Sequence, residues 1–273
     1  MPEARLWPKA LDYYSALIGK NKALTQGPGG NTSLKLGGLI WVKASGLNLA
    51  DAEAIPIFCQ IDKANPMVSL SDSNLRPSIE AYLHALIPYP VVYHVHSVGS
   101  ISLAIRRKLT ERQLLMLDAS KLGYVGYWKP GEQLGTQIKR LIEENPGLQG
   151  ALLKNHGIVL WGEELKILYE TLLSIESEIC EALEIDTSTD ISHEDFETLK
   201  EVGFLTPDHA VFSSLISSKD LQPRNMWIKD LVWCLALAVK SIRKGEEVES
   251  LNPKDVEELV NWDLEEERQR IQK

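Results

Sequence analysis

The spacing of apolar residues changes along the chain and predicts a mixture of helices and strands. Apolar residues recur at helical spacing in 165–182, where they mark one face of a long amphipathic helix. Shorter patterns of the same kind predict helices at 5–18, 77–86, 97–107, 110–117 and 131–144. Short apolar runs bounded by turn residues predict strands at 32–36, 39–44, 91–96, near Tyr124, at 151–154 and at 158–161.

The character of the sequence changes after residue 185. The run from Asp186 to Asp190 is a polar break, and the segment beyond it is largely helical in pattern. Helices are expected there at 220–243 and 253–269. We therefore expect a chemical domain over residues 1–185 and a helical C-terminal extension over 186–273.

Composition and charge exclude several classes of partner. Hydrophobic residues make up 44% and charged residues 25%, as in a globular protein, and the formal net charge is −9. A negative chain has no general attraction for nucleic acid or an anionic membrane, so neither is expected as a partner. The N-terminal stretch lacks the order of a secretory signal, and the three cysteines form no CxxC pair. The expected location is the cytoplasm.

The sequence Tyr93-His94-Val95-His96 places two imidazoles on one face of a predicted strand, because alternate strand residues face the same side. Two imidazoles on a buried face are costly unless they bind something, and a divalent metal is the usual ligand. A solvent-facing edge strand, or histidines bonded to backbone carbonyls, would also explain the pair. The motif alone leaves these alternatives open.

A third histidine favours the metal. His156 follows an apolar run and precedes Gly157, at a turn from which its ring would point into a cavity at the end of the sheet. His94, His96 and His156 are therefore the expected ligands, and three nitrogens leave the open position that is typical of catalytic zinc. The other histidines are His84 in a predicted helix, His193 in a charged stretch, and His209, which we expect to be structural.

Two further segments have ordinary explanations when taken alone. Gly29-Gly30-Asn31-Thr32 is compatible with a simple hairpin turn, or with a loop whose backbone N–H groups bind an anion. It matches neither the P-loop nor the dinucleotide-binding pattern. Glu80 stands near the start of a predicted helix, where an acidic residue interacts favourably with the helix dipole.

These segments in this order resemble the class II aldolase/adducin family. GPGGNTSLKLGGLIWVKASG is similar to its glycine-rich phosphate loop, and RPSIEAYLHALIPYPVVYHVHS to its Ser-x-Glu helix and His-x-His strand. GYVGYWKPGEQLG resembles the segment that carries a tyrosine before a proline-glycine turn, and ALLKNHGIVLWG the third-histidine motif. The resemblance covers about residues 5–185. VKASG and the later TPDH most resemble the aldolase portion of bacterial two-domain rhamnulose-phosphate aldolase/dehydrogenase proteins.

The resemblance implies an α/β fold, namely a three-layer αβα sandwich with a central, mainly antiparallel sheet, followed by the helical extension. It makes the three histidines ligands of Zn²⁺ or another divalent metal, and Glu80 the acid/base beside it. Tyr127 would donate a proton at the aldehyde, reaching into a neighbouring subunit of a homotetramer. The residues that would bind phosphate are Gly30, Asn31, Ser45, Gly46 and Ser78.

Two departures from the family pattern weaken this phosphate pocket. Pro28 stands where a hydroxyl-bearing residue is usual, and Ile79 stands where a second serine often occurs. A substrate without phosphate, or with its anion placed differently, therefore stays open at this point.

The implied activity is cleavage of a ketose, as a ketose 1-phosphate, into dihydroxyacetone phosphate and an aldehyde through a zinc-stabilised enediolate. The partner is then a small sugar or sugar phosphate. Three alternatives share the fold: a pentulose-phosphate 4-epimerase, a methylthioribulose-phosphate dehydratase and a non-catalytic adducin-like protein. Family epimerases typically have aspartate at the position of Glu80, and an adducin-like protein would not need the metal ligands, so the residues favour an aldolase.

Overall fold

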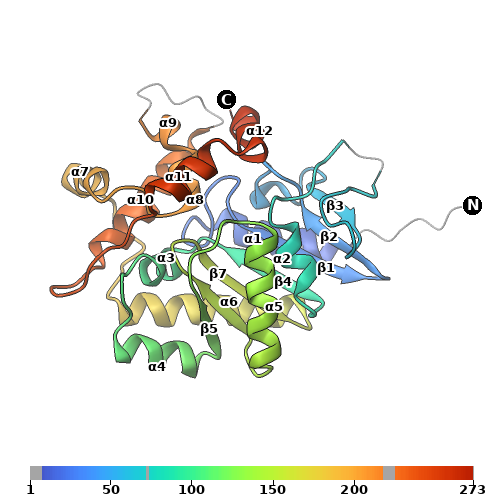
Figure 1. Ribbon diagram of the computed structural model, residues 1–273, viewed down its shortest axis with the longest axis horizontal. Helices are drawn as coiled ribbons and strands as arrows, with labels where there is room; N and C mark the ends of the chain where they lie inside the picture. Colours follow the sequence, from blue (N-terminus) through green and yellow to red (C-terminus); the bar gives the residue numbers. More distant parts are fainter. Residues whose placement is uncertain (1–7, 72–73, 218–224, 273) are drawn as a thin grey trace, which may run out of the picture.

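A seven-stranded sheet forms the centre of the protein (Figure 1). The structure is a computed structural model that describes residues 8–71, 74–217 and 225–272. The strands are β1 (Asn31–Leu36), β2 (Leu39–Lys43), β3 (Phe58–Ile61), β4 (Val91–Val95), β5 (Leu122–Val125), β6 (Gly150–Leu153) and β7 (Gly157–Gly162). They lie in the order β3-β2-β1-β4-β7-β6-β5, and every neighbouring pair is antiparallel except β5 and β6. The predicted mainly antiparallel sheet is confirmed.

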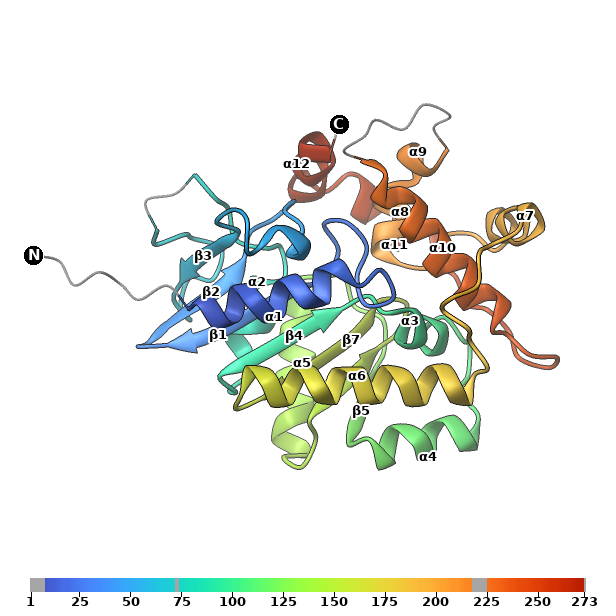
Figure 2. The same ribbon diagram turned by 180° about the vertical axis from the view of Figure 1, so that it is seen from behind.

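Helices cover both faces of this sheet and give the predicted three layers. One face is covered by α1 (Lys9–Lys20), α3 (Val98–Ala104), α4 (Glu111–Ala119) and α6 (Leu165–Ala182), and the other by α2 (Ala81–Leu86) and α5 (Glu132–Glu144). Figure 2 shows α1 and α6 in front of the strands, and Figure 1 shows α5 in front of the opposite face. A short 3-10 helix, η1 (Leu49–Asp51), packs against α1.

The alternation of side chains in β4 explains why two separate cores form. Tyr93 packs with α1 and α6 in the core on one face, and its hydroxyl donates to the carbonyl oxygen of Leu165 over 3.0 Å. Val92 points the other way, into the core made with α2 and α5. The same alternation turns His94 away from Tyr93, as the strand pattern predicts.

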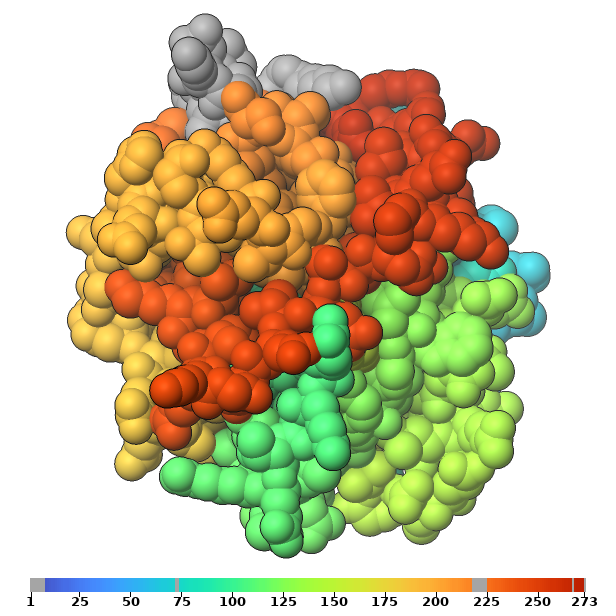
Figure 3. Space-filling model, turned by 60° about the vertical axis from the view of Figure 1, so that its left-hand side comes forward, coloured from blue at the N-terminus to red at the C-terminus, as the bar shows by residue number. Residues whose placement is uncertain are grey.

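The regular elements of the C-terminal segment, in the described part of the chain, are all helices. These are α7 (His193–Glu201), α8 (Pro207–Val211), α9 (Ser213–Ile216), α10 (Trp227–Lys240), α11 (Pro253–Val260) and α12 (Asp263–Gln272). Ile228 and Leu235 of α10 belong to the same buried cluster as Val98 and Ile101 of α3, so this segment shares a core with the first part of the chain. Figure 3 shows its orange and red residues lying directly against the green segment.

Three sequence expectations need correction or completion. The single helix expected at 253–269 is wrong, because α11 ends at Val260 and α12 begins at Asp263. Between them Trp262 lies under the ammonium group of Lys129, 4.3 Å from the ring centroid, a contact that the helical pattern does not contain. Strand β3 was not expected. Residues 5–7 of the first predicted helix and 220–224 of the helix at 220–243 lie outside the described residues.

None of the helices in the described ranges combines the length and the apolar character needed to span a lipid bilayer.

Candidate metal centre

Two neighbouring strands bring the three predicted histidines to the same end of the sheet. His94 lies in β4 opposite Val159 of β7, and His96 follows β4 directly. His156 occupies the tight turn between β6 and β7. A side chain at Gly157 would place its Cβ 2.4 Å from the carbonyl oxygen of Val95, so glycine is required for this turn to approach β4.

Glu80 reaches the histidines from the residue that precedes α2. The helix begins at Ala81, so Glu80 lies at its N-terminal boundary and not inside the first turn. Asn31 of β1 donates from Nδ2 to Oε2 of Glu80 over 2.7 Å. The amide oxygen of Asn31 is bound by Nε2 of His84, which fixes the direction of that amide. His84 is therefore a structural support behind Asn31.

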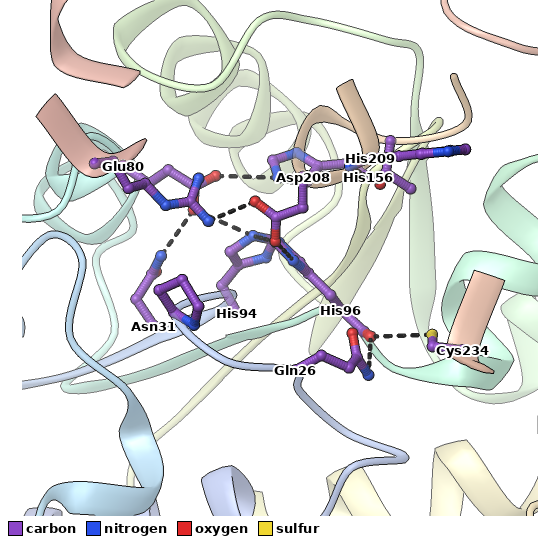
Figure 4. Close-up of polar contacts among 12 residues, drawn as sticks. Gln26, Asn31, Glu80, His94, His96, His156, Asp208, His209 and Cys234 are labelled. Carbon is purple, nitrogen blue, oxygen red and sulfur yellow. Dashed lines mark hydrogen bonds and ion pairs between the residues drawn. The ribbon is translucent and has the colours of Figure 1, made fainter. Parts of the chain in front are cut away.

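The four side chains form one compact cluster (Figure 4). Nε2 of His94 lies 3.0 Å from Nε2 of His96 and 3.3 Å from Oε2 of Glu80. Nε2 of His156 lies 3.4 Å from Oε1 of Glu80. Ligand atoms bound at about 2.0–2.1 Å to one tetrahedral ion lie roughly 3.3–3.4 Å apart. The four candidate ligand atoms all lie within 4.8 Å of one another, so they could hold a single ion after small adjustments.

A buried polar atom of Glu80 and the protonation states of His156 and Glu80 also fit a metal. Oε1 of Glu80 is buried and has no hydrogen-bond partner among the described residues, which fits an atom that faces an ion. Burial lowers the pKa of His156 to about 3, so its ring is neutral near pH 7, as a ligand must be. Burial alone would raise the pKa of Glu80, but His94 and His156 hold it well below its usual range. The carboxylate is therefore ionised.

A second group of residues holds the histidines from behind. Nδ1 of His94 donates to the carbonyl oxygen of Ile158 over 3.0 Å, and Nδ1 of His96 lies 2.9 Å from Oδ2 of Asp208 in α8. A hydrogen bond at Nδ1 leaves Nε2 free to bind a metal, the usual arrangement behind ligating imidazoles. The carboxylate of Asp208 also binds the guanidinium group of Arg268 in α12.

The residues predicted to bind phosphate surround a small cavity beside this cluster. Its walls include Gly30, Asn31, Ser45, Gly46 and Ser78 together with Glu80, His96 and His156. The cavity has a volume of about 20 Å³, which is room for about one water molecule. Arg268 and Glu265 of α12 complete its wall, so α12 covers the site.

Tyr127 is not among the described residues that line this cavity. Its hydroxyl is buried with no hydrogen-bond partner in the described chain, and its ring packs against the core of the C-terminal segment. Burial and the nearby Asp255 and Glu258 raise the pKa of this phenol. The role of Tyr127 in a neighbouring subunit stays a prediction. His209 also lies away from the cluster, since its Nδ1 accepts a hydrogen bond from the backbone N–H of Leu205 (Figure 4).

The sequence interpretation missed four charged residues of the cavity: Lys43, Asp208, Glu265 and Arg268. Two of them carried a signal. Lys43 interrupts an apolar strand, and Asp208 follows Thr206-Pro207, where a threonine cap and a proline predict the start of a helix. Glu265 and Arg268 belong to an otherwise polar helix and carry no such signal.

Comparisons with known proteins identify relatives over the first two thirds of the chain. The family model described as class II aldolase and adducin N-terminal domain matches residues 11–182. The chain is 29% identical to a Bacillus subtilis protein named uncharacterized oxidoreductase YuxG. The match covers 63% of this chain but only 29% of the length of that relative. It is 28% identical to the methylthioribulose-1-phosphate dehydratase of Enterobacter, covering 50% of this chain and 74% of the enzyme.

Two further comparisons agree with these matches. The L-fuculose phosphate aldolase of Methanococcus maripaludis is 28% identical, over 52% of this chain and 78% of that enzyme. The N-terminal class II aldolase domain of a conserved protein from Thermoplasma acidophilum superimposes with a TM-score of 0.56 at 24% identity, covering 67% of this chain and 96% of that structure. This likeness supports the same fold.

Proposed function

Because this chain belongs to the class II aldolase and adducin family, we propose that it is a metal-dependent aldolase that cleaves a ketose 1-phosphate into dihydroxyacetone phosphate and an aldehyde. The observation that carries the proposal is the buried cluster of Glu80, His94, His96 and His156, in which one oxygen of Glu80 has no hydrogen-bond partner within the described part of the chain. A carboxylate held this way beside three imidazoles can both support a cation and move a proton.

The chain supplies most of what the reaction needs. Zn²⁺ or another divalent ion, held by His94, His96 and His156, would provide positive charge next to the oxyanion that develops on cleavage. When the carbon–carbon bond breaks, its electron pair stays on the fragment that carries the ketone, and the hydroxyl proton of the other fragment must leave so that the aldehyde can form. Tyr127 is the proposed carrier that takes this proton away from the substrate. Glu80, which is ionised before the reaction, takes up one proton in exchange and delivers it to the new carbanion carbon, so the number of protons balances.

Assembly belongs to the same proposal. If Tyr127 serves a neighbouring site, the functional unit is a closed homo-oligomer, by resemblance a tetramer. Four large apolar side chains remain exposed near β5, the last strand of the sheet: Leu114, Leu115, Tyr124 and Trp128. A contiguous exposed apolar patch is typical of contact surfaces, so the region around β5 is where we expect a neighbouring chain to bind.

Proton exchange tests the role of Glu80 without requiring knowledge of the aldehyde. Metal-loaded protein supplied with dihydroxyacetone phosphate in heavy water should incorporate deuterium stereospecifically at the carbon that forms the new bond. Glu80→Gln should stop this exchange and leave metal content nearly intact, because the amide keeps the shape but accepts no proton. Glu176→Gln changes another buried glutamate, outside the cavity, and should exchange like the wild type.

Two outcomes would contradict the proposal. Full exchange in Glu80→Gln would place the base elsewhere. A wild-type protein that exchanges no proton, but dehydrates methylthioribulose 1-phosphate, would make it a dehydratase. That second candidate is favoured by the 28% identity to the Enterobacter enzyme, which equals the identity to the aldolase of Methanococcus maripaludis.

A further inference from the structure

The buried face of α12 is polar. Among the side chains of this helix that the structure describes, the buried ones are Glu265, Arg268 and Gln272, and their spacing places them on one face. The apolar side chain of Ile271, by contrast, is 46% exposed. A helix that docks only for packing buries its apolar residues. The reversed pattern indicates that α12 supplies polar groups to the cavity beneath it.

Glu265 is fully buried in this face, and it lines the cavity together with Glu80. Its two carboxylate oxygens share one nitrogen of Arg268, Nη1, at 3.3 and 3.2 Å. Hydrogen bonds between a charged nitrogen and a carboxylate are usually about 2.7–2.9 Å long. Burying a carboxylate is costly, and one long contact within the same helix offsets little of that cost. The ion pair with Arg268 therefore does not by itself explain why a glutamate stands here.

Glu265 can exchange a proton near neutral pH. Burial raises its pKa to about 7, against the effect of Arg268, and the charges of Asp208 and Glu80 act in the same direction as burial. Near pH 7 the carboxyl group is therefore present in both its acid and its base form. This is the condition under which a side chain is most effective in general acid–base catalysis.

The other charged groups of the cavity already have partners or tasks. Glu80 lies among the histidines and is the proposed base at carbon. Both oxygens of Asp208 are engaged, one of them by His96 over 2.9 Å. Lys43 donates from Nζ to two backbone carbonyl oxygens. Of the carboxyl groups described in the cavity wall, Glu265 is the one that remains for the hydroxyl proton of the substrate.

Tyr127 requires such an acceptor. Burial and the charges of Asp255, Glu258 and Glu265 raise the pKa of its phenol, which is therefore protonated near pH 7. A protonated phenol can take a proton only if it gives up its own at the same time. Of these three carboxyl groups, Glu265 is the one that lines the cavity in the described part of the chain. A tyrosine that enters the cavity, from this chain or from a neighbour, would therefore find its acceptor in Glu265.

We propose that Glu265 is a further acid/base residue of the site, which exchanges the proton of the substrate hydroxyl group through the phenol of Tyr127. In cleavage, Tyr127 takes the hydroxyl proton and passes its own to the carboxylate of Glu265. The electron pair of the O–H bond then forms the carbonyl bond of the aldehyde, and the pair of the broken carbon–carbon bond stays on the ketone fragment. In condensation, protonated Glu265 returns a proton by the same route. The inference rests on the proposed function and adds a residue from outside the segment 11–182 that the family model matches.

Two reactions of the metal-loaded protein separate Glu265 from Glu80. Deuterium exchange into dihydroxyacetone phosphate requires Glu80, whereas condensation of this compound with glycolaldehyde also requires a proton on the new hydroxyl oxygen. Glu265→Gln should exchange deuterium like the wild type but condense roughly 100-fold more slowly, the lower end of general acid–base effects. Glu266→Gln changes an exposed neighbour on the same helix and should match the wild type in both reactions. Metal content and circular dichroism check that each variant retains its fold.

The pH dependence distinguishes proton transfer from a structural role. Condensation needs protonated Glu265, so the wild-type rate should fall as pH rises through the pKa of this carboxyl group, about 7. Glu265→Gln should lose this fall. Glu265→Asp, which keeps a carboxyl group, should retain it and recover part of the rate. Infrared spectra of wild type and Glu265→Gln over the same pH range should differ by one carboxyl group that titrates near pH 7.

Wild-type condensation rates in Glu265→Gln would overturn the inference and leave the aldolase proposal intact. A parallel loss of exchange and condensation, with the pH dependence unchanged, would also overturn it, because Glu265 would then be structural. So would infrared spectra in which no carboxyl group assigned to Glu265 titrates near neutral pH, whether or not glycolaldehyde reacts. Absence of deuterium exchange in the wild type would reject the aldolase reaction itself, and with it this role of Glu265.

Discussion

His96 is held at both nitrogens of its ring. Nε2 faces His94 in the cluster, and Nδ1 donates to Asp208, which lies 112 positions later in the chain. The pKa of Asp208 is lowered far below its usual range because Arg268 and His96 outweigh the effect of burial, so the carboxylate stays ionised. It therefore fixes the tautomer of His96 and makes the ring a better metal ligand.

We expect Asp208→Asn to weaken metal binding by roughly 10–100-fold, the usual effect of losing a carboxylate behind a ligating histidine. Affinity can be measured by competition with a chelating dye. Asp186→Asn serves as the control, because within the described residues this carboxylate binds only its neighbours Ser188 and Thr189. An affinity within twofold of the wild type in folded Asp208→Asn would show that Asp208 does not position His96.

The three histidine ligands could be predicted from the sequence because each is marked by residues that are its neighbours in the chain. His94 and His96 share one strand face, and His156 stands beside a glycine at a turn. Asp208 and Lys43 enter the site through tertiary packing: their partners lie in other elements and depend on how α8 and β2 are placed. No periodic pattern contains that information, so their roles needed the structure.

The docking of α12 depends on a glycine in the turn after β2. Gly46 has φ +75°, and a Cβ there would lie 2.8 Å from Cδ1 of Ile271. The side-chain amide of Gln272 also donates to the carbonyl oxygen of Gly46 over 2.9 Å. Glu265 and Arg268 of α12 form part of the wall of the small cavity beneath it, so we expect α12 to move when a sugar phosphate binds.

We therefore expect Gly46→Ala to weaken the packing of α12 against the turn after β2 and to speed the removal of bound metal by a chelator. If the free energy of this packing falls by about 1.4 kcal/mol, the rate of removal should rise on the order of tenfold. Gly38→Ala is a matched control, because Gly38 has φ +82° but nothing within 4 Å of its Cβ position. Both variants bear the backbone strain of alanine at positive φ. Equal rates of metal loss in the two variants would mean that the contact between Gly46 and Ile271 does not hold α12 over the cavity.

The long elements were predictable and the short ones were not. Helix α6 matches its predicted range because six apolar residues repeat over 18 positions. Strand β3 has four residues, one of them the polar Gln60, and so short a segment fits a strand or a buried turn equally well. The break between α11 and α12 depends on Trp262 and its contact with Lys129, which comes from a distant segment.

At the scale of the whole molecule, the cavity is built from nearly the full described length, from Pro28 to Arg268. The family model covers only residues 11–182, so Asp208 and α12 lie outside it. The division into 1–185 and 186–273 stays a prediction. The shared core of α3 and α10 shows that the second segment is packed against the first.

Mixing two inactive variants tests whether neighbouring chains share a site. Tyr127→Phe and Glu80→Gln chains, mixed in equal amounts and allowed to exchange, should recover up to about a quarter of wild-type activity, because that fraction of shared sites receives both intact residues. Activity and mass by light scattering check this outcome. No recovery despite demonstrated exchange would assign Tyr127 to the site of its own chain.

The hydrogen bond between His96 and Asp208 also limits which segment of this chain can be moved into another protein with its metal site intact. A fusion or domain exchange cut at residue 185 would keep all three histidines and Glu80 but would separate His96 from the carboxylate that orients it. It would also remove the helix that carries Arg268 from the cavity wall. The smallest portable unit is therefore the chain through α12, and a recombination point chosen from the limits of the family domain would cut through the site.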